Sequence, residues 1–456
     1  MPLQKNQVLT LRVERLSSDG SGVAHSPDGE TVFIPGAAPG DEARVRIVKD
    51  CKRYAFGILD EVLTPSPDRI PVDCAVAGPC GGCSLRHLDY AAELRAKQEN
   101  VADAFARIGG LDVPVLPIVG SPEVNRYRNK VQFPVGVDKS GKPCIGFYAG
   151  RTHRIVPCPD CRLQPGVLNE IGNALCAFFA EKGIQPYSEE TGRGLVRHIF
   201  LRRGAHSGQI MVCLVCTRAK LPSAEELCTR LKAQFAEITT ILLNVNAKNT
   251  NVILGTETHT LYGQGYIEDT LCGVPVQLGP LSFYQVNTLA AEQLYGIAAQ
   301  YAQLTPDDLL LDLYCGMGTI GLSMAAHCRE LIGVEIVPEA IESAKANAAR
   351  MGADVAAKSR FFCADAGQAA TRLAAEGLHP DIVMLDPPRK GCDEATLSAV
   401  VRMSPRRVVC VSCNPATAAR DAAWLEQNGY HAEKVQPVDL FPRTRHCECV
   451  LSFSKV

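Results

Sequence analysis

The first 64 residues carry short apolar segments in which apolar and polar positions tend to alternate, the pattern of half-buried β-strands. The segments of strand length are residues 8–13, 31–34, 43–47 and 56–62. Turn-forming pairs such as Asp28-Gly29 and Pro39-Gly40 separate them. We therefore expect residues 1–64 to form a small β-barrel of about five strands.

The pattern becomes mixed over residues 65–270, which we expect to form a second, α+β unit. Three prolines between residues 65 and 71 favour a stiff linker. Residues 90–108 have helical spacing, and this helix could pack on the C-terminal unit. Between residues 125 and 263 the pattern is mostly that of strands, with one clear helix near residues 222–235.

From residue 271 to the end, short apolar strands alternate with helical stretches. This alternation is typical of a doubly wound parallel sheet, so we expect residues 271–456 to adopt a Rossmann-like α/β fold. The expected strands are residues 309–313, 331–334, 382–385 and 408–411, with closing strands at 435–438 and 449–453.

Composition agrees with a multi-domain α/β protein of 456 residues. Hydrophobic residues make up 46% and charged residues 21%, which excludes a mainly disordered chain. The sequence has no membrane-length apolar run and no signal-peptide core, so we expect a cytoplasmic protein with no membrane partner. A net charge of −2 shows no overall basic character, and 20 cysteines in a reducing compartment would be thiols, metal ligands or a nucleophile.

A glycine-rich segment predicts a cofactor site. Gly316, Gly318 and Gly321 have GxGxxG spacing after one strand, and Glu335 ends the next strand, where it can accept ribose hydroxyls. Both a dinucleotide and S-adenosylmethionine (SAM) suit this arrangement. Asp386, held at a strand end by two following prolines, favours SAM because hydride transfer has no evident use for it.

Two further residues suggest chemistry at the same edge of the sheet. Cys413 directly follows a predicted strand, and a thiol there can be activated by dipoles or positive charge. Glu448 lies among apolar-type residues in a strand-like stretch, so it is either paired structurally or a general base with a raised pKa.

Taken together, these motifs resemble the RNA uracil-5-methyltransferase family along the whole chain, and the N-terminal barrel resembles the OB-like, RNA-binding TRAM domain. The motifs are Asn125-Arg126-Tyr127-Arg128-Asn129-Lys130, Arg197-His198, Phe283-Tyr284-Gln285-Val286-Asn287, Asp312-Leu313-Tyr314-Cys315-Gly316, Asp386-Pro387-Pro388-Arg389, Ser412-Cys413-Asn414-Pro415 and the stretch from Pro442 to His446-Cys447-Glu448.

The resemblance implies formation of 5-methyluridine in RNA, with Cys413 adding to uracil C6 and Glu448 removing the C5 proton. Asp386 would orient the pyrimidine or contact SAM. The remaining SAM contacts would be Gln285, Tyr314, Glu335 and, more weakly, Asp365. The resemblance favours 23S ribosomal RNA over transfer RNA as the substrate, and nothing in the sequence indicates an obligate protein partner.

The cysteines at 74, 80, 83, 158 and 161 suggest a metal site. From spacing alone, Cys80, Cys83, Cys158 and Cys161 could hold zinc as a double CxxC, whereas Cys74, Cys80, Cys83 and Cys161 could hold a [4Fe–4S] cluster. The resemblance favours the iron–sulfur set, in a loop of the central unit. Cys213 and Cys216 lie on a predicted strand and would face opposite ways, so we interpret them as packing residues.

Basic residues gather in two central segments, and the second contains no acidic residue between positions 192 and 220. Such unpaired cations suit RNA phosphates. They are Arg126, Arg128, Lys130, Lys139, Lys142, Arg151, Arg154 and Arg162, then Arg193, Arg197, Arg202, Arg203, Arg218 and Lys220. Two other classes of protein fit parts of the sequence, a dinucleotide-dependent oxidoreductase and a non-catalytic iron–sulfur RNA-binding protein.

Overall fold

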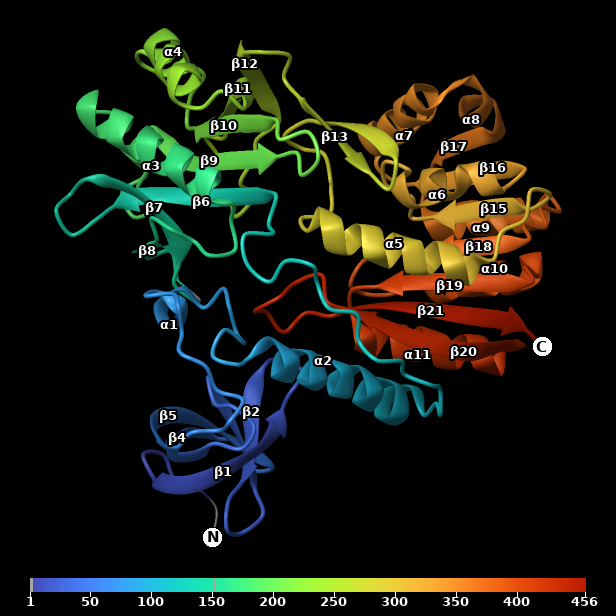
Figure 1. The fold of residues 1–456 in the computed structure, drawn as a ribbon, viewed down its shortest axis with the longest axis horizontal. Helices are drawn as coiled ribbons and strands as arrows, with labels where there is room; N and C mark the ends of the chain where they lie inside the picture. Colours follow the sequence, from blue (N-terminus) through green and yellow to red (C-terminus); the bar gives the residue numbers. More distant parts are fainter. Residues whose placement is uncertain (1–2, 151) are drawn as a thin grey trace.

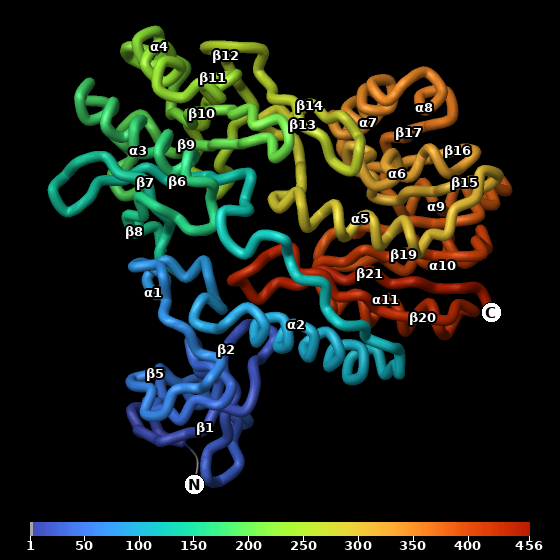
Figure 2. The backbone as a smooth tube through the Cα atoms, viewed as in Figure 1, coloured from blue at the N-terminus to red at the C-terminus, as the bar shows by residue number. Residues whose placement is uncertain are grey.

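The computed structural model describes residues 3–150 and 152–456. Its sheets, in chain order, are a closed barrel, a seven-stranded sheet, a two-stranded hairpin and a second seven-stranded sheet (Figure 1). Figure 2 traces the backbone from the barrel, through a long helix and the central sheet, into the C-terminal sheet. Among the described residues, no helix combines the length and apolar character needed to cross a membrane.

The N-terminal barrel closes in the order β1-β2-β3-β5-β4. Its strands are β1 (Val8–Leu16), β2 (Ser21–His25), β3 (Thr31–Pro35), β4 (Glu42–Asp50) and β5 (Tyr54–Thr64). The four strands predicted individually are present. The fifth, β2, has four consecutive buried residues and therefore shows no alternation that a sequence pattern could reveal.

A helical linker follows the barrel and packs against both the barrel and the C-terminal unit. It comprises α1 (Ala77–Cys80), α2 (Tyr90–Ala104) and a π-helical turn, η1 (Phe105–Gly109). Asp89 caps α2 by accepting a hydrogen bond from a first-turn amide. Ala96 packs with Leu16 of the barrel, whereas Val101 and Phe105 pack in the core of the C-terminal unit. Helix α2 therefore bridges the two units.

The central sheet has the strand order β12-β11-β10-β9-β6-β7-β8 and carries two helices. Its elements are β6 (Lys130–Val137), β7 (Pro143–Tyr148), β8 (Ile155–Pro157), α3 (Gly166–Glu181), β9 (Val196–Arg203), β10 (Ile210–Cys216), α4 (Ala224–Gln234), β11 (Ile238–Val245) and β12 (Glu257–Tyr262). The sequence pattern predicts α4 but misses α3. Both Phe178 and Phe179 of α3 are buried, so this helix is apolar over a wide face and lacks a clear polar period.

The C-terminal sheet has the order β17-β16-β15-β18-β19-β21-β20, and only β21 runs antiparallel to its neighbours. The strands are β15 (Leu309–Leu313), β16 (Glu330–Glu335), β17 (Ser359–Cys363), β18 (Ile382–Leu385), β19 (Arg407–Ser412), β20 (Tyr430–Val438) and β21 (Glu448–Lys455). The chain starts in the middle at β15 and extends the sheet first to one side and then to the other. This reversal creates the crevice in which open α/β sheets bind ligands.

Helices cover both faces of the C-terminal sheet (Figure 1). One buried cluster contains residues of the hairpin β13 (Ile267–Leu271) and β14 (Val274–Leu278), together with α5 (Thr288–Ala302), α6 (Thr319–Met324), η2 (Ala325–His327) and α7 (Pro338–Met351). The opposite cluster contains residues of α9 (Ala366–Ala375), α10 (Glu394–Met403) and α11 (Pro415–Gln427), and a short helix α8 (Ala353–Lys358) follows α7. The carboxyl ends of the parallel strands thus form one edge that lies between two helical layers.

Candidate active site

Three reactive side chains occupy neighbouring strand ends at this edge. Asp386 follows β18, Cys413 follows β19, and Glu448 is the first residue of β21. Strand β19 lies between β18 and β21, and because β21 is antiparallel to β19, its start meets the end of β19. The structure therefore brings together the three residues that the sequence predicts to be catalytic.

Cys413 lies half-buried in the turn between β19 and α11. Asn414 caps α11, and its side-chain amide donates to the backbone carbonyl of Arg389 at 3.0 Å. Burial raises the pKa of the Cys413 thiol, and the charges of Glu448 and Asp386 raise it further. The Arg389 guanidinium opposes this through its charge and a hydrogen bond. The thiol is therefore protonated at rest, with a cation in place to stabilise the thiolate.

Arg389 is a functional candidate whose role the sequence motifs do not reveal. Its guanidinium Nη2 lies 3.2 Å from Nδ1 of His446. Burial, together with the charge of Arg389, lowers the pKa of His446 to about 4, so the imidazole is neutral and accepts the hydrogen bond. Its position in the sequence could have indicated this role, because Arg389 is only three residues beyond Asp386 at the same strand end.

The two carboxyl groups of the site both hold their protons unusually strongly. Glu448 is 6% exposed, and burial, reinforced by the charge of Asp386, raises its pKa to about 8. Burial raises the pKa of Asp386 to about 7. Both groups can therefore exchange a proton near neutral pH, which is the property that general acid–base chemistry requires.

The loop that carries Asp386 and Arg389 is fastened to α11. The Arg420 guanidinium donates to the carbonyls of Lys390 and Cys392, and the Asp421 carboxylate accepts the Cys392 amide at 2.8 Å. Gly391 has a positive φ of 78°, and a Cβ there would lie 2.5 Å from both Arg420 Nη2 and Asp421 Oδ2. Only glycine fits this close approach, so the loop that carries Asp386 and Arg389 is held in place against α11.

The glycine loop after β15 is held by acidic side chains. Glu335 Oε2 accepts the Gly316 amide at 3.1 Å, and Asp312 Oδ2 accepts the Gly321 amide at 3.0 Å. Burial raises the pKa of Asp312 to about 8. Gly318 has a φ of 80° and caps α6. These contacts fix the turn that the sequence predicts to approach the cofactor, and they join it to Glu335.

The other predicted cofactor contacts have different surroundings. The Gln285 side chain contacts Tyr295, whose pKa the charge of Asp386 also raises, which places Gln285 near the reactive edge. The Tyr314 hydroxyl lies 3.3 Å from Thr396 Oγ1 on α10. Asp365 accepts an amide as the N-cap of α9, a structural role at the next strand end. Their roles in cofactor binding stay predictions.

Comparisons with known proteins identify the family. Residues 204–456 match the family described as tRNA (Uracil-5-)-methyltransferase, and residues 2–59 match the TRAM domain. The chain belongs to the tRNA (uracil-5-)-methyltransferase family. It is thus a SAM-dependent RNA uracil-5-methyltransferase, so the oxidoreductase alternative is wrong, as is that of a non-catalytic binding protein.

Relatives of this methyltransferase cover its full length. An RNA methyltransferase of Halalkalibacterium halodurans is 43% identical over 98% of this chain and 97% of its own, and one of Bacillus cereus is 41% identical over 100% and 98%. The crystal structure of the Pyrococcus abyssi tRNA (uracil-54, C5)-methyltransferase with S-adenosyl-L-homocysteine has a TM-score of 0.77 and 26% identity, covering 98% of this chain and 100% of the other.

The predicted cluster cysteines of the methyltransferase lie in one neighbourhood. The charges of Cys74, Cys83 and Cys161 all act on the thiol of Cys80. A hydrogen bond from Cys158 and two backbone amides lower the pKa of Cys161 to about 6. Within residues 3–150 and 152–456, no three Cys, His, Asp or Glu side chains converge as closely as ligands of one metal ion do.

Donors around these thiols suit anionic sulfur. Arg86 is 3% exposed, and it hydrogen-bonds Cys83 and Asp73, while its Nε and Nη2 have no oxygen or nitrogen partner among the described residues. Gln164 Nε2 lies 3.9 Å from Cys161 Sγ. The residues present therefore fit a group that needs thiolate ligands.

The second basic segment is less available to RNA than its sequence indicates. Arg197 is 4% exposed, pairs with Glu189 and lies over the Tyr187 ring. Arg202 is 1% exposed and donates to two backbone carbonyls. The expectation that Arg197 and Arg202 are free to bind phosphate is therefore wrong. A sequence alone does not show which cations are paired.

The first basic segment retains unpaired charge. The Lys130 side chain has no ion pair or hydrogen bond with any described residue, and burial beside Arg202 and Arg128 lowers its pKa to about 8. Arg126 instead pairs with Asp160. Arg151 lies outside the described residues.

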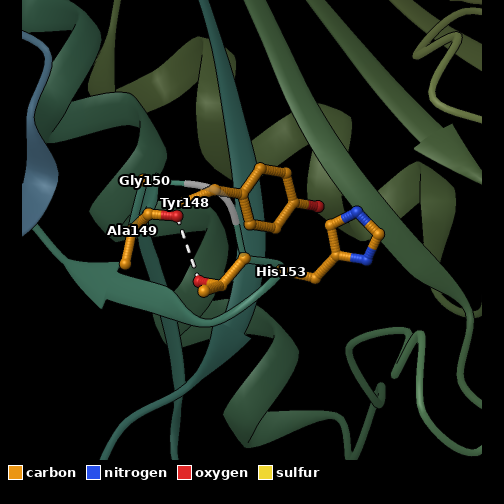
Figure 3. A pocket seen from close by; sticks show the side chains of 5 residues that line it. Tyr148, Ala149, Gly150 and His153 are labelled. Atoms are coloured by element: carbon orange, nitrogen blue, oxygen red, sulfur yellow. Dashed lines mark hydrogen bonds between the residues drawn. The ribbon is translucent and has the colours of Figure 1, made fainter. Parts of the chain in front are cut away.

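Aromatic rings lie beside this segment as well. Figure 3 shows Tyr148 and His153 lining a surface pocket. Their ring centroids are 5.6 Å apart. Of the four aromatic residues near these cations, Tyr127 and Phe133 are core and Phe147 and Tyr148 are partly exposed. Lys130 and the Tyr148 ring are therefore among the side chains of this region that remain available to RNA, together with the exposed Lys139, Lys142 and Arg154.

The structure confirms that Cys213 and Cys216 are packing residues. Both are fully buried on β10. They belong to different hydrophobic clusters, one on each face of the central sheet. They therefore point in opposite directions and cannot share a ligand.

Proposed function

We propose that the chain methylates C5 of a uracil in structured RNA through a covalent adduct between Cys413 and C6. Uracil C5 is too weak a nucleophile to take a methyl group directly. Addition of the Cys413 sulfur to C6 breaks the C5–C6 double bond and leaves an enolate in which C5 is nucleophilic. The observation that carries this proposal is the position of Cys413 between Asp386 and Glu448 at one sheet edge.

Each residue of the site has a role in this reaction. Arg389 stabilises the Cys413 thiolate, because it is the cation that hydrogen-bonds this sulfur. Asp386 orients the pyrimidine at its junction with the methyl donor. SAM, when bound, supplies an electrophilic methyl group, and Gly316, Gly318 and Glu335 form its cradle, with Gln285, Tyr314 and Asp365 as further contacts.

Glu448 acts as the base that completes the reaction. Once C5 carries both a methyl group and its original proton, the Glu448 carboxylate takes that proton. The C–H electron pair then re-forms the C5–C6 double bond, and the C6–S electrons return to Cys413 as thiolate. A carboxylate with a pKa of about 8 is basic enough for this step, and it then releases the proton to water.

We propose 23S ribosomal RNA as the substrate. The resemblance of the TRAM barrel together with the four-cysteine loop supports this choice. A second candidate is transfer RNA, which the Pyrococcus abyssi relative's description favours. Unmodified 23S RNA and unmodified transfer RNA, each incubated with methyl-labelled SAM, separate the two. Label confined to transfer RNA would exclude the ribosomal assignment.

The target base must reach a recessed thiol. Cys413 is half-buried, and a base stacked in a helix cannot present C6 to it. We therefore propose that the uridine leaves its stack, or lies in an unpaired loop, before the sulfur adds.

We also propose that Cys74, Cys80, Cys83 and Cys161 hold a [4Fe–4S] cluster with a structural role. Each thiolate of such a cluster binds a different iron, so the ligands stand farther apart than those of a single zinc ion. The charges of Cys74, Cys83 and Cys161 act on the thiol of Cys80, so these four side chains lie in one neighbourhood, and the family resemblance favours the cluster over zinc. The loop also adjoins the catalytic unit, because the Leu85 amide donates to the Arg443 carbonyl.

A further inference from the structure

Three aromatic rings contact one another on the outer surface of the barrel. Phe33 of β3 and Phe56 of β5 are directly opposite in the parallel pair, and Tyr54 lies two residues before Phe56 on the same face. Their ring centroids are 5.7 Å apart for Phe33 and Tyr54, 5.8 Å for Phe33 and Phe56, and 5.6 Å for Tyr54 and Phe56. The three rings form one continuous aromatic surface, which we call the aromatic triad.

The triad does not belong to the barrel core. Val32 and Ile34, which alternate with Phe33, are fully buried inside the barrel, so Phe33 points outward. Tyr54 is 41% exposed. Helix α2 contacts the barrel through β1, and no element outside the barrel packs comparably on β3 or β5 among the described residues. The rings are therefore open to a partner.

Cations border the triad. Lys49 of β4 is directly opposite Phe56, and Lys52 and Arg53 lie in the turn that leads into Tyr54. None of these three side chains has an ion pair or hydrogen bond with a described residue. One acid, Asp50, shares the turn, and its carboxylate accepts the Lys52 amide at 2.7 Å. The surface is thus aromatic with a net positive rim.

Packing within the barrel does not require this combination. Neighbouring outward cations of β4 are neutralised, since Arg46 pairs with Asp60 and Arg44 pairs with Glu61. The cations beside the triad are not. A face that pairs exposed rings with free cations matches the two needs of single-stranded nucleic acid, base stacking and phosphate neutralisation.

We propose that Phe33, Tyr54 and Phe56 form a stacking platform for unpaired bases of the RNA substrate, and that Lys49, Lys52 and Arg53 bind its phosphates. The proposal rests on RNA being the substrate and adds a second contact, on the barrel, to the one at the methylation site. Stacking of this kind tolerates any base, so the platform holds a single-stranded segment without reading its sequence.

Binding of the full-length protein to RNA tests the platform separately from catalysis. The probe is a fluorescein-labelled single-stranded RNA of roughly 10 nucleotides, followed by anisotropy. Tyr54→Leu removes the ring and should weaken binding by about fivefold or more, whereas Tyr54→Phe keeps the ring and should bind as the wild type does. Ultraviolet cross-linking with mass spectrometry should attach the probe to a peptide containing Tyr54 or Phe56.

Salt dependence separates the rings from the cations. Lys49→Gln should reduce the slope of log affinity against log salt concentration by about one, and Tyr54→Leu should leave that slope unchanged. Ile108→Ala, which removes an exposed apolar side chain outside the barrel, is the matched control and should change neither.

Unchanged affinity in Tyr54→Leu, with no cross-link to the β5 peptide, would overturn the platform. Loss of self-association in that variant with unchanged RNA affinity would assign the face to a second copy of the chain and also overturn it. Because binding is measured without methyl transfer, either result is independent of whether Cys413 methylates uracil.

Discussion

Asp386 and Glu448 lie at the ends of β18 and β21, the two strands that flank β19, which leads into Cys413, and the charge of Asp386 raises the pKa of Glu448. The two carboxyl groups therefore do not both ionise easily, and one proton is retained near neutral pH. Both groups also raise the pKa of the Cys413 thiol. Ionisation of the nucleophile is thus coupled to the protonation of its two acidic neighbours.

Cys413→Ala should abolish methyl transfer, by a factor of roughly 10⁴ or more, while SAM binding survives, because the thiol is needed only for the covalent step. Labelled methyl incorporation and calorimetric SAM binding measure the two properties. Cys410→Ala is the matched control, since Cys410 is a buried residue on β19, the strand that leads into Cys413. Normal turnover in Cys413→Ala would end the proposed mechanism.

Glu448→Gln should accumulate a covalent RNA adduct, because the amide cannot remove the C5 proton while Cys413 can still add. We expect turnover to fall roughly 10²- to 10⁴-fold and the protein–RNA band to survive denaturing electrophoresis. The wild-type rate should rise with pH until Glu448 is ionised, near pH 8. A variant that turned over freely, with no adduct, would remove Glu448 from the role of base.

The raised pKa of Glu448 also predicts a pH-dependent stability. The group titrates at about 8 when folded but near 4.3 when unfolded, so between these values the folded state keeps a proton that the unfolded state has lost. The free energy of unfolding should therefore fall as pH rises from about 5 to 8. Glu448→Gln should escape this loss and exceed the wild type by on the order of a few kcal/mol at pH 8.

Urea titrations at several pH values measure this difference in the free energy of unfolding. Glu339→Gln, which changes an exposed carboxylate on α7, is the control and should follow the wild-type curve. A constant difference between Glu448→Gln and the wild type at all pH values would contradict the raised pKa.

Replacement of Arg389 should make Cys413 less reactive. Arg389→Met removes the cation that lowers the thiol pKa, so alkylation of Cys413 by iodoacetamide at neutral pH should slow by about tenfold. Peptide mass spectrometry reports the rate, with the exposed Cys363 as an internal standard. Arg389→Lys should retain part of the effect through its charge, and equal alkylation rates in all three proteins would exclude Arg389 as the activating group.

The cysteine set predicts a specific pattern of iron loss. Anaerobically purified protein should be brown and contain four irons per chain, the content of one [4Fe–4S] cluster. Cys80→Ser should lose the iron and its absorbance, whereas Cys158→Ser, at a residue outside the proposed ligand set, should keep both. One zinc per chain, lost in both variants, would instead indicate the double CxxC arrangement.

Much of the candidate site follows from local sequence. Apolar runs at β18 and β19 predict strands, and the polar residues directly after them, Asp386 and Cys413, must project at the carboxyl edge because parallel strands end on the same side. Glycine spacing similarly locates the turn at Gly316. These inferences succeed because they depend only on neighbouring residues and on the regular geometry of a parallel sheet.

The tertiary structure decided how these local features combine. The antiparallel course of β21 brings Glu448 beside Cys413, and burial of the carboxyl group raises its pKa to about 8. Pairing across the fold shows that Arg197 and Arg202 are structural, although their sequence resembles a phosphate-binding segment. Burial and long-range pairing depend on residues distant in the chain, so the sequence determined which reactive groups are present and the packing determined which of them act together.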